Sequence, residues 1–126
     1  MEINIITIPH KSQRYDTCGD YELDKTTNVL DISISDMKNE DYEFLVGIHE
    51  AIEAYLCHKR KISFDKITKF DIAFEKNRKE GNIDEPGDDP KAPYHREHIF
   101  ATKIEKLLAK ELKVDWKKYD KTVSSL

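Results

Sequence analysis

The chain has little of what several classes of protein require. It contains two cysteines among 126 residues, and Cys18 and Cys57 lie too far apart for a C-x-x-C pair. Neither a disulfide framework nor a cysteine metal motif is therefore expected. No run of about 18 apolar residues is present, so a membrane-spanning helix is not expected either. Residues 1–9 lack the basic start and the cleavage site of a secretory signal. We expect a cytoplasmic protein with free thiols.

The chain also lacks an excess of positive charge. Its 21 Lys and Arg stand against 25 Asp and Glu, which gives a formal net charge of −4. Proteins that bind nucleic acids usually carry a basic surface, so no nucleic-acid partner is expected, and no membrane partner. No linker divides the sequence, and its length suits a single domain over residues 1–126.

The first third of the sequence has the patterns of short strands. β-branched residues dominate 3–8, and apolar and polar residues alternate over 29–34. Gly19-Asp20 resembles the turn of a hairpin over residues 13–23, and Thr26-Thr27-Asn28 is a second turn signal. Because the connections are too short for parallel crossovers, residues 1–38 are expected to form a small antiparallel sheet.

From Asn39 onward the apolar residues recur at helical spacing. Three helices are expected, at about residues 40–60, 63–79 and 94–113. Asn39 and Ser63 are good N-terminal caps, and Asp115 can cap a short final turn. Residues 39–120 thus form a helical part, and 121–126 a frayed tail. Strands followed by helices predict an α+β fold, with the sheet packed on the first helix.

The most informative stretch is His49-Glu50-Ala51-Ile52-Glu53, which has the form H-E-x-x-E. Residues four apart share one face of a helix, so His49 and Glu53 can bind one metal ion. Glu50 would then be the base for a metal-bound water. On a helical wheel His49 falls inside the apolar arc and Glu53 at its rim, where an ionised carboxylate needs a partner or a metal.

The third predicted helix repeats this pattern. His98 and Glu105 fall within its apolar stripe. We predict His49, Glu53 and His98 as the metal ligands, with Glu105 orienting a ligating histidine from outside. His95, one turn earlier, is the substitute for His98 and otherwise an outer residue of the site. Two imidazoles and one carboxylate leave a coordination position open for water, as in catalytic zinc sites.

The H-E-x-x-E stretch resembles the active-site helix of zincin metallopeptidases, whose usual form is H-E-x-x-H. The resemblance implies a helix packed under a small sheet, His49 as the first ligand, Glu50 as the general base and a third ligand from downstream. It also implies a peptide or protein substrate. Glu53 stands where the second histidine is usual, and a carboxylate there suits manganese or iron as well as zinc.

The chain as a whole resembles small proteins encoded by phages and prophages. The stretches that carry this resemblance are residues 14–20, 49–57 and 93–105, with Trp116 beyond them. It implies a mobile-element setting and no particular activity.

Two other hypotheses fit the same residues. A buried His/Glu network can simply hold the first and third helices together in a non-catalytic accessory protein of a mobile element. Alternatively, Glu50, Glu53, Asp71 and Glu75 can form a helical carboxylate site for magnesium, like that of a nucleotide pyrophosphohydrolase. The metal-centre hypothesis requires His49, Glu53 and His98 to converge within about 4 Å of one point.

Overall fold

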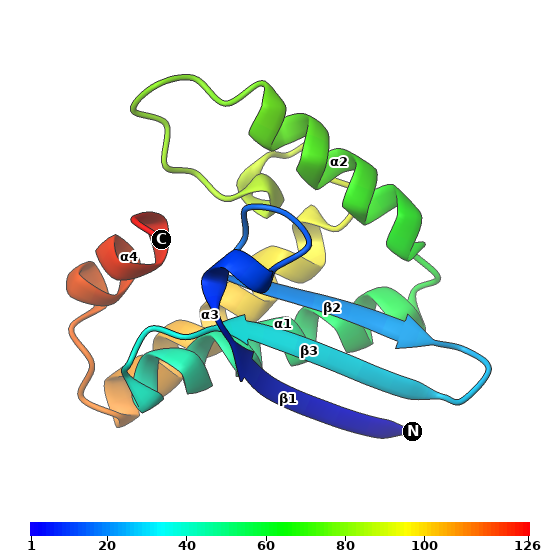
Figure 1. The fold of residues 1–126 in the computed structure, drawn as a ribbon, viewed down its shortest axis with the longest axis horizontal. Coiled ribbons are helices and arrows are strands. Elements are labelled where there is room, and N and C mark those ends of the chain that lie inside the picture. The colour runs from blue at the N-terminus through cyan, green and yellow to red at the C-terminus, as the bar shows by residue number, and fades with distance from the viewer.

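A computed structural model describes residues 1–126 and has an α+β fold, a three-stranded sheet followed by four helices (Figure 1). The strands are β1 (Glu2–Ile8), β2 (Gly19–Asp24) and β3 (Val29–Ser35). The helices are α1 (Glu40–Lys59), α2 (Phe64–Lys76), α3 (His95–Glu111) and α4 (Trp116–Ser124). Two 3₁₀ turns, η1 (His10–Ser12) and η2 (Pro86–Asp88), lie in the connections. No helix combines the length and the apolar character that crossing a bilayer requires.

The sheet is mixed, so the prediction of an antiparallel sheet was wrong for one of its two pairings. The strand order is β1-β3-β2, with β1 parallel and β2 antiparallel to β3. No long crossover is needed, because β2 reverses the direction of the chain and β3 then inserts between β1 and β2. The hairpin predicted over residues 13–23 is also wrong, since Gly19 begins a strand. The turn at Thr26-Thr27-Asn28 does join β2 to β3, and the Asp24 carboxylate accepts hydrogen bonds from the backbone N–H groups of Thr26 and Thr27.

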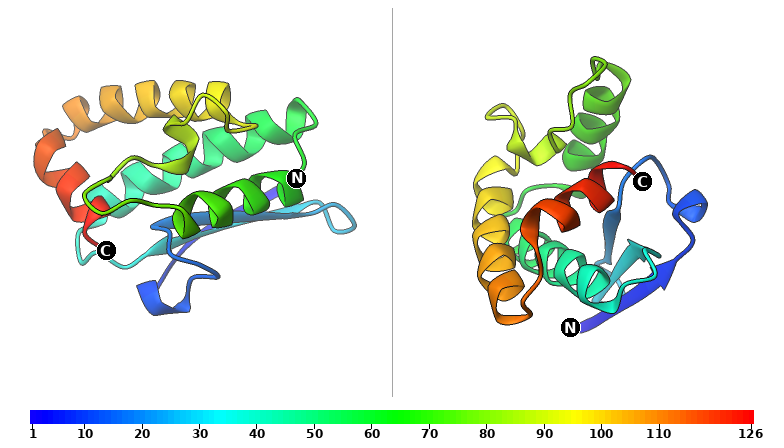
Figure 2. Two further views of the ribbon diagram at one scale, coloured as in Figure 1. Left: turned by 90° about the horizontal axis from the view of Figure 1, so that it is seen from above. Right: turned by 90° about the vertical axis from the view of Figure 1, so that its left-hand side faces the viewer.

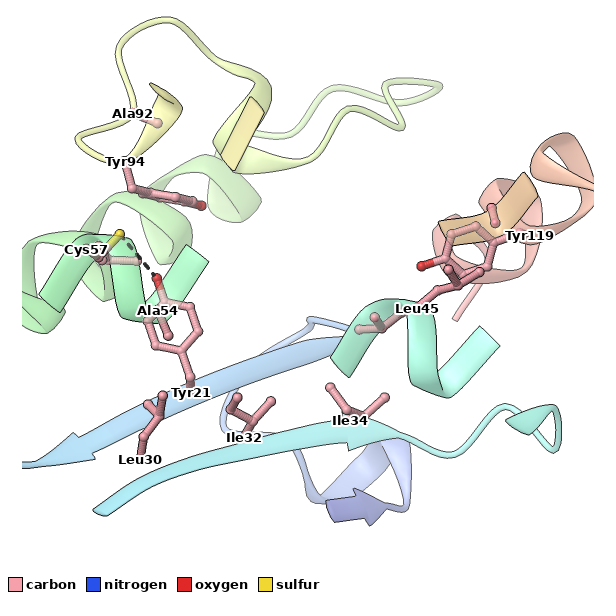
Figure 3. Close-up of a cluster of buried hydrophobic side chains, with 13 residues drawn as sticks. Tyr21, Leu30, Ile32, Ile34, Leu45, Ala54, Cys57, Ala92, Tyr94 and Tyr119 are labelled. Atoms are coloured by element: carbon pink, nitrogen blue, oxygen red, sulfur yellow. Dashed lines mark hydrogen bonds between the residues drawn. The ribbon is translucent and has the colours of Figure 1, made fainter. Parts of the chain in front are cut away.

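Helix α1 packs against one face of the sheet and positions the H-E-x-x-E stretch. Asn39 caps it by accepting a hydrogen bond from the Tyr42 N–H, as its sequence predicts. Alternate side chains of β3 point at α1 and meet its apolar face, as Figure 3 shows for Leu30, Ile32 and Ile34. Burial of these side chains fixes which face of α1 turns inward.

Helix α1 lies between the sheet and α3 (Figure 2). Helix α2 lies along β2 on one side, and α4 covers the other end of the helical layer (Figure 1). Ser63 and Asp115 cap α2 and α4 as predicted. The prediction of three helices and a frayed tail at 121–126 was wrong, because α4 is a regular helix to Ser124, anchored by the buried Tyr119.

Candidate metal centre

A cavity of about 470 Å³ opens between the four helices, the start of β2 and the loop that carries η2. Helix α1 contributes His49, Glu50 and Glu53 to its wall, and α3 contributes His98 and Glu105. The five residues therefore share one cavity although they come from two helices far apart in the sequence.

The structure brings His49, Glu53 and His98 into direct contact. The Nε2 atom of His49 lies 3.1 Å from Oε2 of Glu53 and 3.1 Å from Nδ1 of His98. The same Glu53 oxygen lies 2.8 Å from His98 Nδ1. All three residues are at least 95% buried. Three potential ligand atoms thus form a nearly equilateral triangle, which meets the convergence that the metal-centre hypothesis requires.

The other nitrogen of His49 is held by a carboxylate. Its Nδ1 lies 2.7 Å from Oε1 of Glu105, and the buried Tyr119 hydroxyl donates to the second oxygen of Glu105. A carboxylate here accepts a hydrogen bond from Nδ1–H, which leaves the Nε2 lone pair directed into the triangle. Glu105 takes the place predicted for it, and Tyr119 adds a support from α4 that the sequence did not reveal.

His98 is held in the same way from the opposite side. Its Nε2 lies 3.0 Å from Glu85 Oε2 and 3.1 Å from Asp88 Oδ1, both in the acidic loop around η2. Nε2 therefore carries the hydrogen, and Nδ1 presents its lone pair to the triangle. His95 does not approach the triangle. It bonds instead through Nδ1 to the carbonyl oxygen of Gly87 at 2.8 Å and so anchors the loop.

With both imidazoles neutral, the triangle consists of three hydrogen-bond acceptors. Acceptors this close repel one another unless a proton or a metal cation lies among them. Burial alone lowers the pKa of both histidines, but the surrounding carboxylates outweigh it, raising that of His98 to about 12 and that of His49 well above its usual value. Burial raises the pKa of Glu53, but hydrogen bonds from the two histidines outweigh this effect and lower the pKa to about 2. The centre therefore attracts positive charge strongly.

The size of the triangle fits a divalent metal. For metal–ligand bonds of about 2.1 Å, ligand atoms are about 3.0 Å apart at right angles and about 3.4 Å apart at tetrahedral angles. The three measured separations, 2.8, 3.1 and 3.1 Å, agree with three ligands on one face of an octahedral ion. A tetrahedral zinc ion requires each pair of ligand atoms to separate by a few tenths of an ångström more.

Glu50 lines the same cavity and is the one carboxylate of this group that accepts no hydrogen bond. Burial and the neighbouring charge of Glu53 raise its pKa well above its usual range. The backbone of Gly19 passes directly over it. An added Cβ at this glycine would lie 2.8 Å from Glu50 Cγ and 2.9 Å from Oε1. A side chain at position 19 would therefore displace the carboxyl group of Glu50.

The four carboxylates of the magnesium hypothesis do not form one cluster. Asp71 is buried and accepts hydrogen bonds from the hydroxyls of Tyr15 and Tyr94, while Glu75 pairs with Arg78. The groups whose ligand atoms can hold a metal are His49–Glu53–His98 and the set of Glu85, Asp88 and His98. Asp71 therefore does not lie on a solvated face of α2, because the two tyrosines hold it in a buried position.

Comparison of the chain with family models, with characterised proteins and with solved structures finds no match. No relative therefore supplies a ligand, a substrate or a reaction for this site.

Proposed function

We propose that the protein is a metal-dependent hydrolase with a zincin-like centre, acting on peptide bonds. The observation that carries the proposal is the triangle of His49 Nε2, Glu53 Oε2 and His98 Nδ1, with the outer nitrogen of each histidine held by carboxylate. Ligating histidines in metalloenzymes characteristically donate their second N–H to a carboxylate, which fixes the tautomer and makes the inner nitrogen more basic.

Two histidines and one glutamate are also the ligand set of several catalytic zinc sites. The order of the ligands along this chain differs from that in H-E-x-x-H enzymes. Glu53 stands in the place of the second ligating histidine, and His98 completes the ligand set from another helix. The chemistry of the three donors is the same. We therefore propose zinc, manganese or iron as the metal, with the triangle's dimensions favouring the two ions that accept octahedral coordination.

Glu50 is the proposed general base. A divalent metal at the triangle would polarise a water molecule and the scissile carbonyl group. Glu50 stands beside the triangle without a hydrogen-bond partner of its own. A divalent cation at the triangle would favour its ionised form, which could take the proton of the attacking water and deliver it to the leaving amine.

Metal analysis of protein prepared without a histidine tag tests the proposal first. We expect about one equivalent of transition metal, or uptake to that level on titration, with His49→Ala abolishing it. Glu50→Gln should keep the metal and lose hydrolysis of a quenched fluorescent peptide library. His58→Ala, an exposed histidine of the same helix, is the matched control and should change neither property.

The rival proposal is a non-catalytic protein whose His/Glu network only joins α1 to α3. The distances that favour it are those of ordinary hydrogen bonds, which protonated histidines would make to Glu53 and Glu105. Less than about a tenth of an equivalent of metal, with no uptake on titration, would establish this rival and end the metal hypothesis.

A further inference from the structure

The outward face of helix α1 carries no charge over its middle turns. The acids of this stretch turn into the cavity, and the residues that face outward are Phe44, Ile48, Ala51, Ile52 and Tyr55. Phe44 is 50% exposed and Tyr55 is 46% exposed. Charged residues make up 37% of the chain, so a solvated helix face of this length should contain several of them. A helix that is apolar on all sides is typical of one that is covered on all sides.

Helix α3 continues this apolar surface. Its Glu105 contacts His49 in the middle of α1, and its Glu97 contacts Arg60 directly after the end of α1. The two helices therefore lie side by side and run in opposite directions (Figure 2). Helical spacing places three apolar residues of α3 next to α1, on the side turned away from the cavity. We call the combined surface the back face; it consists of Phe44, Ile48, Ala51, Ile52 and Tyr55 with Phe100, Ile104 and Leu107.

The back face is large for a surface left open to water. Phe44, Tyr55 and Phe100 each expose about half of their surface, so these three aromatic residues alone present roughly 300 Å². That matches the largest apolar patch on a typical monomer, and the aliphatic residues enlarge it. With the charged side chains at its two ends, the back face approaches the roughly 800 Å² that each partner contributes to a stable interface.

The part of the back face on α1 has a twofold pattern. The exposed Asp41 and Lys59 lie at its two ends, at equal distances from the middle of the helix. Phe44 and Tyr55 lie between them and share nearly the same midpoint. A twofold axis that crosses α1 at this midpoint, within the plane of the face, reverses the face end for end. It would set Asp41 of one copy against Lys59 of the other, and the two aromatic rings against each other.

The part on α3 has the same pattern. The exposed Arg96 and Glu111 lie at its ends, and their midpoint is also that of Phe100 and Leu107. Because the middles of the two helices lie side by side, one axis serves both. It would set Arg96 against Glu111 and Phe100 against Leu107 of the other copy. An axis along the helices would set like charges together, which is unfavourable. The back face is therefore complementary to itself when one copy is reversed.

We propose that two copies of the chain associate through their back faces, with the helices of one copy reversed against those of the other. The second copy is the occupant that fits, because the face matches itself both in its apolar residues and in its charges. The cavity lies on the opposite side of the α1–α3 pair and stays open in such a dimer. The association is thus independent of whether a metal binds.

Sedimentation equilibrium of the untagged chain tests the association. Between about 5 and 200 μM the mean mass should rise from that of one chain toward that of two. The mass of a single chain at the highest concentration would overturn the proposal and leave the back face to a different protein. Masses beyond two chains would overturn the closed twofold arrangement.

One substitution on each of two helices locates the interface. Phe100→Glu would bury a carboxylate against the apolar surface of the other copy, so this variant should remain monomeric at every concentration. Ile72→Glu is the matched control, because Ile72 is 48% exposed on α2, outside the back face, against 49% for Phe100. It should leave the mass unchanged. Loss of the dimer in both variants, or in neither, would overturn the assignment of the back face. Leu107→Glu replaces Phe100→Glu if that variant does not fold.

Exchange of charges tests the reversed arrangement. Asp41→Lys and Lys59→Asp should each raise the dissociation constant of the dimer at least about threefold at low salt, because each sets like charges together across the interface. The chain with both substitutions should regain most of the lost affinity, since every pair is restored with its signs exchanged. A doubly substituted chain that dimerises no more tightly than either single variant would overturn the reversed arrangement.

Discussion

Replacing Gly87 by alanine should weaken metal binding without touching any ligand. Gly87 lies in η2, with its backbone pressed against the ring of His98. A Cβ added here would lie 2.3 Å from His98 Cγ and 2.5 Å from Nδ1. Ordinary contacts begin at 3.4 Å, so the loop must move outward by about 1 Å or the ring must leave the triangle. The backbone of Gly87 does not have a positive φ, so alanine adds no conformational strain.

The size of the effect follows from the contacts that the displaced loop would lose. Asp88 and Glu85 would move away from His98 Nε2, and the bond from His95 to the Gly87 carbonyl oxygen would lengthen. The two carboxylates are 42% and 47% exposed, so each contact contributes at most about 1 kcal/mol to folding. Their effect on the metal is larger, because loss of an outer partner of a ligating histidine typically costs about 10–100-fold in affinity.

The assay is competition with a chromophoric chelator for zinc and for manganese, together with the melting temperature of the metal-free protein. Gly81→Ala is the matched control. It lies in the same connection, has nothing within 4 Å of an added Cβ, and has a φ of +82° that costs alanine about 1–2 kcal/mol. Gly81→Ala should therefore lose stability but keep its metal affinity. A folded Gly87→Ala protein that binds metal within about threefold of the parent would refute the role given to the loop.

Three further predictions concern the triangle and its supports. Glu105→Gln should weaken metal binding about 10–100-fold, and Tyr119→Phe should weaken it less, both measured by the same competition. Equal effects of the two variants would contradict a chain of hydrogen bonds that runs from Tyr119 through Glu105 to His49. The raised pKa values of His49 and His98 mean that the metal-free centre holds protons at neutral pH, so metal affinity should rise about tenfold per pH unit for each proton released between pH 6 and 8; a flat profile would contradict it. The pKa of Glu53, lowered from 4.5 to about 2, contributes stability to the metal-free protein above pH 4.5 that is lost as the pH falls toward 2, and acid unfolding of Glu53→Gln should lack this component.

The helices and their caps could be predicted because their signals are local. Each helix cap lies directly before an apolar repeat, and its side chain accepts a hydrogen bond from the backbone N–H only three residues further on. The capping residues are Asn39, Ser63 and Asp115. The sheet could not be predicted to the same extent. Strand order depends on which strand inserts between two others, and the start of β2 at Gly19 carries the same residues as a turn.

The inward direction of His49, Glu53 and His98 could also be predicted, because apolar periodicity fixes the buried face of a helix. The contacts of Glu85 and Asp88 with His98 could not be predicted. Acidic residues beside glycine and proline are typical of a solvated loop, and only the packing of that loop on α3 gives them a partner. Tyr119 escaped prediction for the same reason, since its partner lies on another helix.

The two histidines of the triangle are supported by two different segments of the chain, and this links the centre to the fold. Helix α4 supports His49 through Tyr119 and Glu105, while the loop around η2 supports His98. If α4 detached, Glu105 would lose the hydrogen bond that the Tyr119 hydroxyl donates to its second oxygen. The hydrogen bonds between these carboxylates and the two histidines thus help to hold the short helix α4 and the loop around η2 in place. An ion bound there, by fixing both imidazoles in one tautomer, would stabilise both segments together.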